Sequence, residues 1–278
     1  MSRNPVELAP GILLGGEALP VVAGPCVLEE PQQALEIAQA LKAVGHRLGL
    51  PIIFKASFDK ANRSALKSYR GPGLEAGLEV LRQIGNATRL PILTDVHEVS
   101  QCETAAEICD VLQVPAFLCR QTDLILAAAE TGRAVNLKKG QFMAPDDMRR
   151  AVDKARSTGN TKVSVTERGV SFGYHNLVVD MRSFEMLHAE GIAVIYDVTH
   201  SLQLPGAGEE TGGQRQFAEP LARAAVAAGA DGLYLEVHPE PERARSDSTT
   251  QLDPMRAEAL LASALSIRQA LVQETSSN

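Results

Sequence analysis

The chain has 278 residues and a formal net charge of −7, and 45% of its residues are hydrophobic. This composition can fill a sizeable core, which excludes a disordered chain, and the acidic balance argues against a nucleic-acid-binding protein. No apolar run approaches the ~20 residues that cross a bilayer, and the first residues lack the basic and apolar segments of a secretory signal.

Eight short apolar runs, many of them β-branched, follow one another in a regular order and predict strands. They cover residues 19–24, 51–56, 91–96, 110–115, 134–139, 162–167, 193–198 and 232–237. Segments with helical apolar spacing lie between them. One of these is 31–44, which begins at Pro31, and the last helix is expected to begin at Asp253-Pro254.

Strands that alternate with helices predict parallel βαβ units, and eight such units in about 250 residues predict an α/β fold of the (β/α)8 TIM barrel type. A doubly wound open sheet is the competing architecture, but no Gly-x-Gly-x-x-Gly follows the first apolar run. We therefore expect a single barrel domain over residues 1–278. The residues before 19 are expected to form a short N-terminal hairpin that closes the barrel floor.

The active site of such a barrel lies at the carboxyl ends of its strands, so the residues that end each run are candidates for function. Two lysines, Lys55 and Lys138, lie inside apolar runs, where burial is costly unless an anion meets the charge. Together with Arg168 they predict a site for a phosphate or carboxylate. The polar residues at the strand ends are Cys26, Lys55, Ser57, Asp95, His97, Gln113, Lys138, Arg168, Asp197, His200, Glu236 and His238.

The segment after the second run is rich in cations. Lys60 and Arg63 are expected to extend the anion site, whereas Lys67 and Arg70 are interpreted as solvated surface residues.

A second candidate site combines a thiol, an imidazole and two carboxylates, at Cys26, His200, Glu236 and Asp247. Three of these follow strands one, seven and eight, which become neighbours when a barrel closes. The set suits Zn²⁺, Fe²⁺ or Mn²⁺. No Cys-x-x-Cys spacing supports it, and a lone cysteine is usually a small buried hydrophobe, so from the residues alone both interpretations stay open.

The other three cysteines, Cys102, Cys109 and Cys119, have no partners at ligand spacing and are interpreted as packing residues. So few cysteines in a chain of this length do not form a disulfide scaffold, and we expect a globular protein of the reducing cytoplasm.

Several longer motifs resemble the family of 3-deoxy-D-manno-octulosonate 8-phosphate synthases. They include AGPCVLE, IIFKASFDKANRSALKSYRGPG, QVPAFLCRQTDL, NLKKGQF, YDVTHSLQLPG and EVHPEPERARSDSTTQL, and the likeness runs from about residue 20 to 252. The resemblance implies a (β/α)8 barrel that is typically a homotetramer. It also implies condensation of phosphoenolpyruvate with D-arabinose 5-phosphate and water, which releases phosphate and yields a lipopolysaccharide precursor.

The resemblance also implies roles for individual residues. The phosphoenolpyruvate subsite would comprise Lys55, Ser57, Lys60, Gln113, Ala116, Lys138 and Arg168. The arabinose 5-phosphate subsite would comprise Asn62, Arg63, Ser64 and Arg120, with Arg63 and Ser64 supplied by a neighbouring subunit. The catalytic candidates are Lys55, Lys138, His200, Asp95 and Asp247, without an assignment of acid or base.

Two positions separate branches of this superfamily. The loop Lys60-Ala61-Asn62-Arg63-Ser64 carries Asn62, which marks the arabinose-using branch, whereas the alternative, an erythrose 4-phosphate-using 3-deoxy-heptulosonate 7-phosphate synthase, usually reads K-P-R-[ST] there. Cys26 marks the metal-dependent branch, and the metal set Cys26, His200, Glu236 and Asp247 is then complete, for a divalent ion of unassigned identity.

Two other classes of function fit parts of the sequence. A Schiff-base aldolase would use a strand-end lysine, Lys138, as its nucleophile. A non-catalytic sugar-phosphate-binding regulator would need the cations alone and would leave Cys26 and His200 without a purpose.

Overall fold

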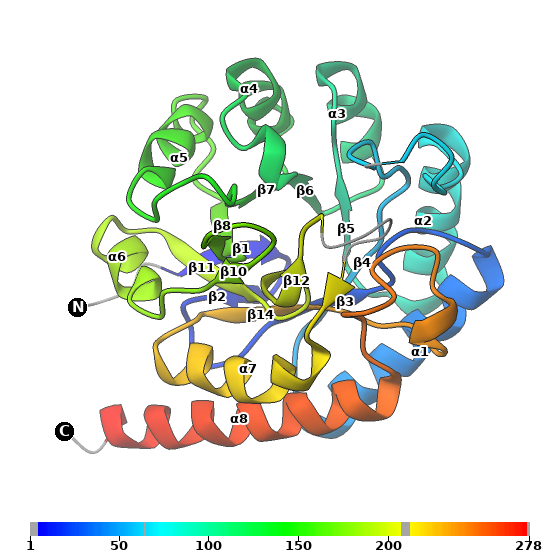
Figure 1. Ribbon diagram of the computed structural model, residues 1–278. Coiled ribbons are helices and arrows are strands. Elements are labelled where there is room, and N and C mark those ends of the chain that lie inside the picture. The colour runs from blue at the N-terminus through cyan, green and yellow to red at the C-terminus, as the bar shows by residue number, and fades with distance from the viewer. Residues whose placement is uncertain (1–4, 64, 207–211, 277–278) are drawn as a thin grey trace.

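The computed structural model describes residues 5–63, 65–206 and 212–276, and its centre is a closed barrel of parallel strands inside a ring of helices (Figure 1). The prediction of a (β/α)8 TIM barrel is therefore confirmed. In barrel order the strands are β11 (Ala193–Asp197), β14 (Gly232–Glu236), β3 (Val21–Gly24), β4 (Ile52–Lys55), β5 (Ile92–Asp95), β6 (Val111–Val114), β7 (Ala134–Lys138) and β8 (Val163–Glu167).

Each barrel strand lies within one of the eight predicted apolar runs. The runs are continuously apolar rather than alternating because the strands are covered on both faces, by barrel interior and by helices. The first and last barrel strands in chain order, β3 and β14, pair with each other, with Glu236 opposite Gly24. The carboxyl ends of strands from the two ends of the chain therefore meet.

The helices pack their apolar stripes against the outside of the barrel (Figure 1). They are α1 (Pro31–Leu48), α2 (Leu74–Thr88), α3 (Val99–Ala106), α4 (Thr122–Glu130), α5 (Met148–Arg156), α6 (Ser183–Ala189), α7 (Ala218–Ala227) and α8 (Pro254–Ser276). Pro31 occupies the first turn of α1, and Gly49 ends the helix in a left-handed conformation. No helix of the described residues is long and apolar enough to span a membrane.

A hairpin of β1 (Val6–Ala9) and β2 (Ile12–Leu14) closes the floor of the barrel, as predicted. Its buried side chains, including Leu8 and Leu14, form one apolar cluster with residues that line the barrel interior, such as Ile53 and Leu93. This cluster fills the amino-terminal half of the barrel, so polar chemistry is confined to the opposite end.

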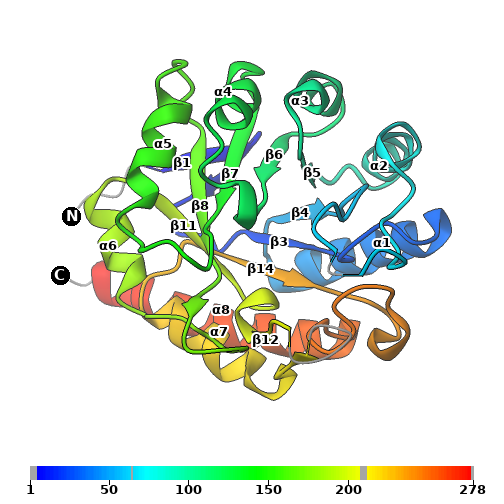
Figure 2. The same cartoon turned by 45° about the horizontal axis from the view of Figure 1, so that its top comes forward.

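Short elements lie in the loops at the carboxyl ends of the barrel strands (Figure 2). Two small hairpins, β9 (Val170–Ser171) with β10 (Leu177–Val178) and β12 (Gln203–Leu204) with β13 (Gly212–Gly213), follow β8 and β11. Among the described residues, four 3-10 turns also lie in the loops that follow barrel strands. They are η1 (Ala116–Leu118), η2 (His200–Leu202), η3 (Arg215–Phe217) and η4 (Pro241–Arg243).

Candidate active site

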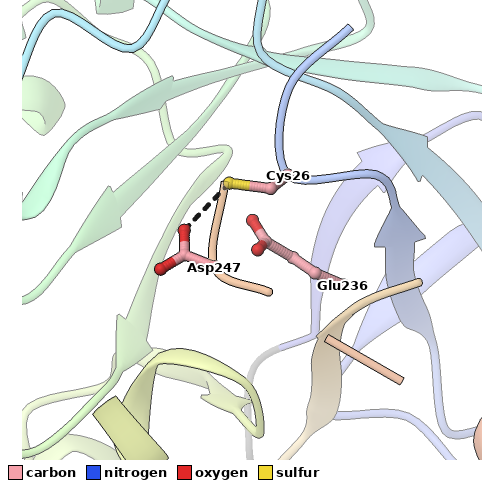
Figure 3. A group of neighbouring side chains, drawn as sticks. All are labelled: Cys26, Glu236 and Asp247. Carbon is pink, nitrogen blue, oxygen red and sulfur yellow. Dashed lines mark hydrogen bonds between the residues drawn. The ribbon is translucent and has the colours of Figure 1, made fainter. Parts of the chain in front are cut away.

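Cys26, Glu236 and Asp247 meet where the first and last barrel strands lie side by side (Figure 3). One ligand atom from each residue lies within 4.8 Å of the others. The Cys26 Sγ is 3.0 Å from Asp247 Oδ2, and Glu236 is fully buried. The structure thus brings together three residues that are far apart in the sequence. Cys26 and Glu236 come from strand ends, whereas Asp247 comes from the loop before α8.

His200, the fourth predicted ligand, lies beside this cluster at the start of η2. Its Nε2 is 3.4 Å from Glu236 Oε1 and 4.0 Å from Asp247 Oδ2, whereas its Nδ1 is 2.8 Å from Asp197 Oδ2. Because a carboxylate only accepts, the Nδ1–H donates to Asp197, and Nε2 is the ring nitrogen that faces the cluster. This is the arrangement in which an outer carboxylate orients a metal-ligating imidazole.

The electrostatics of the cluster fit a bound cation. Burial raises the pKa of the Cys26 thiol well above its usual value, and the neighbouring Glu236 raises it further. The buried Glu236 Oε2 has no hydrogen-bond partner in the described part of the chain. A divalent ion would stabilise the thiolate and satisfy the carboxylate at once, so Cys26, Glu236, Asp247 and His200 form a donor set suited to Zn²⁺, Fe²⁺ or Mn²⁺.

Lys55 ends β4 and projects into the barrel, with 1% of its surface exposed. Its Nζ donates to the Cys26 carbonyl oxygen at 2.9 Å and lies 3.4 Å from Glu236 Oε1 and 3.9 Å from Asp95 Oδ2. Lys60 adds a second ammonium, 4.0 Å from Glu236 Oε1. Lys55 and Lys60 thus border the thiol–carboxylate cluster.

Lys138 ends β7, at the same end of the barrel. Its Nζ pairs with Asp197 Oδ2 at 2.8 Å and lies 3.9 Å from the centre of the Tyr234 ring. Lys55 Nζ lies 5.7 Å from the same ring centre, so both buried ammonium groups lie over the ring of Tyr234.

A buried polar chain crosses the barrel behind these lysines. Asp95 accepts hydrogen bonds from Ser57 and from the Gln113 amide. The Asn136 amide donates to Gln113 Oε1 at 2.9 Å and to Thr166 Oγ1 at 2.8 Å. Burial alone would raise the pKa of the Asp95 carboxyl, but Lys55, Lys60 and Lys138 outweigh it and hold that pKa well below its usual value.

Arg168 follows β8 and is 3% exposed. Its Nη2 donates to Gln203 Oε1 at 2.5 Å. The other two guanidinium nitrogens, Nε and Nη1, are buried and have no hydrogen-bond partner among the described residues. A buried donor without a partner costs stability, so this guanidinium is suited to bind an anion.

The residues predicted to bind the sugar phosphate lie further out. Asn62 and Arg120 are exposed, and Ala116 begins η1 at the edge of the mouth. Arg63 donates from Nε to the Tyr69 carbonyl oxygen at 2.9 Å and from Nη2 to the Arg245 carbonyl oxygen at 3.1 Å. Ser64 lies outside the described residues. No hydrogen bond or ion pair of the described residues joins these side chains to the buried cluster.

Several interpretations of single residues are confirmed by burial and contacts. Cys102, Cys109 and Cys119 are buried, and Arg70 is an exposed side chain paired with Asp59. The sequence predicts Asp197 as a strand-end candidate but assigns it no role, and it does not indicate Asn136, Gln203 or Tyr234. The role of Asp197 could have been inferred, because it ends a strand three residues before His200. Gln203 carries no signal, because it lies beyond the strand ends, in the small β12–β13 hairpin.

The closed barrel with buried lysines and a thiol–carboxylate cluster at the carboxyl ends of its strands places the chain in the class of TIM-barrel enzymes. The sequence pattern of the DAHP synthetase I family matches residues 4–272, and the chain belongs to this family.

Curated relatives with the name "2-dehydro-3-deoxyphosphooctonate aldolase" are similar over most of the chain. The one from Syntrophotalea carbinolica is 56% identical over 239 residues, 86% of each chain. The relative from Pelobacter propionicus is 54% identical, over 91% of this chain and 93% of its own length. The relative from Koribacter versatilis is 51% identical, over 95% of this chain and 96% of its own length.

Proposed function

We propose that the chain condenses phosphoenolpyruvate with D-arabinose 5-phosphate and water to give 3-deoxy-D-manno-octulosonate 8-phosphate and inorganic phosphate, a step of lipopolysaccharide precursor synthesis. The observation that carries the proposal is the buried guanidinium of Arg168, two of whose nitrogens have no hydrogen-bond partner among the described residues, at the same end of the barrel as the buried Lys138 and Lys55. The names of the curated relatives support this reaction for the chain.

The positions of the cations suggest how phosphoenolpyruvate binds. Arg168, together with the backbone of Ala116, would hold the phosphate, and Lys60 with Ser57 would hold the carboxylate at the other end. In the free protein the Ser57 hydroxyl donates to Asp95, so it would turn from Asp95 to donate to the substrate carboxylate. Gln203 already holds the Arg168 guanidinium, so little ordering of that group is needed when the phosphate binds.

The reaction forms one carbon–carbon bond and one carbon–oxygen bond, from water, and breaks one carbon–oxygen bond. C3 of phosphoenolpyruvate bonds to the aldehyde carbon of the open-chain pentose. Water adds at C2, and the C2–O bond to phosphate breaks with its electron pair on the phosphate oxygen. The two protons of the water end on the former aldehyde oxygen and on the released phosphate, which leaves a ketone at C2. Lys138 and Lys55 would stabilise the negative charges, and Glu236 and Asp95 would temper positive character at C2.

Cys26, His200, Glu236 and Asp247 would hold a divalent cation, which supplies Lewis-acid polarisation and orients an oxygen of substrate or water. His200 Nδ1 lies against Asp197 Oδ2, so the residue presents Nε2 to the cluster. Lys138 Nζ contacts the same oxygen, Asp197 Oδ2. Changes at Asp197 would therefore disturb both the lysine and the histidine.

The decisive measurement is phosphate release from phosphoenolpyruvate with Mn²⁺ supplied, in parallel with arabinose 5-phosphate and with erythrose 4-phosphate. We expect turnover with the pentose phosphate and little with the tetrose phosphate. Preference for erythrose 4-phosphate would assign the chain to the alternative synthase. Borohydride added during turnover is expected to trap no adduct on Lys138, whereas a trapped adduct would indicate a Schiff-base aldolase.

We further propose that the chain forms a homotetramer in the cytoplasm, with Arg63 and Ser64 completing the site of a neighbouring subunit. The four cysteines are free and buried, which fits a reducing compartment. Light scattering after size-exclusion chromatography measures the assembly, and a monomeric mass with full activity would contradict a shared site.

A further inference from the structure

Gln203, at the start of β12, joins two parts of the site that come from different strands. Arg168 Nη2 donates to its Oε1 at 2.5 Å, and its Nε2 donates to Asp247 Oδ1 at 2.5 Å. Two short hydrogen bonds therefore connect the buried guanidinium after β8 with the carboxylate that belongs to the thiol–carboxylate cluster.

The chemistry of the two neighbours fixes which way the carboxamide points. A guanidinium offers donors alone, and a carboxylate offers acceptors alone. Only one orientation of the Gln203 amide satisfies both, because the flipped amide would oppose N–H to N–H and oxygen to oxygen. No side chain that only donates or only accepts could bridge this pair.

Both neighbours depend on this bridge. Gln203 is the hydrogen-bond partner of the Arg168 guanidinium among the described residues, since Nε and Nη1 have none. At Asp247, Gln203 takes Oδ1 while Oδ2 faces Cys26 Sγ at 3.0 Å. Ser246 Oγ also donates to Oδ2, at 3.1 Å. The rotation of this carboxylate is therefore fixed by Gln203 at Oδ1 and by Cys26 and Ser246 at Oδ2.

We propose that Gln203 is a positioning residue that couples anion binding at Arg168 to cation binding at Cys26, Glu236 and Asp247, so that each ligand strengthens the binding of the other. The inference rests on the proposed function, which assigns an anion to Arg168. An anion on Nε and Nη1 fixes the guanidinium, the guanidinium fixes the amide, and the amide holds Asp247 Oδ2 toward the cation. Thermodynamic linkage makes the effect reciprocal.

The test compares Mn²⁺ binding with and without saturating phosphoenolpyruvate, measured from the paramagnetic resonance signal of free Mn²⁺. In the wild-type protein we expect the anion to tighten Mn²⁺ binding about fivefold or more. In Gln203→Leu the ratio is expected to fall to near one, and Mn²⁺ affinity without the anion to fall about tenfold. Equal Mn²⁺ affinities with and without phosphoenolpyruvate in the wild type would overturn the proposal. So would a Gln203→Leu variant in which phosphoenolpyruvate tightens Mn²⁺ binding as much as in the wild type.

Two matched variants separate positioning from folding. Gln203→Asn keeps the amide but is one methylene shorter, and it is expected to lose the coupling as Gln203→Leu does. Gln216→Leu changes an exposed glutamine in nearby η3 and is expected to keep it. A loss of coupling in Gln216→Leu equal to that in Gln203→Leu would also overturn the proposal, because the effect would then be nonspecific.

Failure of the proposed function gives a different result. Repeating the measurement with inorganic phosphate in place of phosphoenolpyruvate requires no turnover, so the coupling can be present in a protein that does not condense the two substrates. Steady-state kinetics add a readout specific to Arg168. The KM for phosphoenolpyruvate should rise in Gln203→Leu, whereas the KM for arabinose 5-phosphate should change little; equal rises in both would contradict the assigned position.

Discussion

Asp95 shows how a buried acid can be stabilised by neighbouring lysines. Its pKa is lowered because Lys55, Lys60 and Lys138 outweigh the effect of burial, which acts in the opposite direction. A carboxylate with a lowered pKa adds stability above its unfolded pKa of about 4 and loses it as the pH falls toward the folded value.

Asp95→Asn is therefore expected to destabilise the protein by about 3–5 kcal/mol at pH 7, the usual cost of breaking a buried ion pair. The difference from the wild type should shrink as the pH falls below about 4. Urea unfolding of both proteins between pH 7 and pH 3.5 measures this. A difference that stays constant across the range would show that the charge of Asp95 is not its source of stability.

Cys26 allows a direct test of the cation site. Cys26→Ser is expected to lower the affinity for Mn²⁺ by at least about tenfold, because serine does not offer a soft thiolate ligand. Dialysis against dipicolinate followed by elemental analysis measures the retained metal. Cys102→Ser changes an equally buried cysteine in α3 and should retain the metal of the wild type; loss in both variants would contradict the assignment.

At this scale the sequence predicts the identity of most site residues but not their partners. Lys55 and Lys138 stand out because a lysine inside an apolar run needs a local reason. Asn136 and Gln203 do not stand out, because an amide acquires its role only from the groups that the fold places on its two sides. Their contacts come from strands and loops distant in the chain.

At the scale of elements, the junction of β3 and β4 positions both halves of the site. Gly24 ends β3, two residues before Cys26, and a Cβ there would overlap the carbonyl group of Lys55 at the end of β4. The close approach of these strands requires a residue without a side chain, since backbone cannot move aside as a side chain can.

Gly24→Ala is expected to destabilise the protein by about 1–3 kcal/mol and to lower both Mn²⁺ affinity and kcat, because it separates Cys26 from Lys55. Gly16→Ala is the matched control, since its nearest neighbour to an added Cβ is 3.8 Å away. Thermal unfolding and metal titration of the two variants check this. Wild-type stability in Gly24→Ala would mean that the strands can separate at no cost.

Element positions were predictable because a barrel strand is buried on both faces and reads as an uninterrupted apolar run. The short hairpins β9–β10 and β12–β13 could not be predicted. Each strand in them has two residues, and their pairing depends on which loops the barrel brings together.

At the scale of the molecule, stability and chemistry are separated along the barrel axis. The β1–β2 hairpin packs into the apolar half, whereas the charged residues occupy the opposite end. Leu14→Ala is expected to cost about 2–5 kcal/mol of stability with KM for both substrates unchanged. Leu13→Ala, at an exposed neighbouring position, should stay within about 0.5 kcal/mol of the wild type. Urea unfolding and steady-state kinetics measure the pair, and a changed KM in Leu14→Ala would contradict this separation.

A shared site makes a further prediction about the assembly. Lys55→Ala and Arg63→Ala should each be nearly inactive, because each removes a cation that the proposed site assigns to a substrate. When the two variants are unfolded together and refolded, sites that combine Lys55 from one chain with Arg63 from another should restore part of the activity. Activity that remains at the level of the separate variants would show that both residues serve the same chain's site.

The meeting of β3 and β14 has a consequence for how the protein is made. Cys26 leaves the ribosome early, but Glu236 and Asp247 are among the last barrel-end residues to be synthesised, and the cluster exists only when the final strand pairs with the first. A nascent or truncated chain that lacks β14 has the thiol without its carboxylates. A cation at the proposed site would therefore bind only after the chain has been made as far as Asp247, and it would stabilise only chains in which β14 has paired with β3.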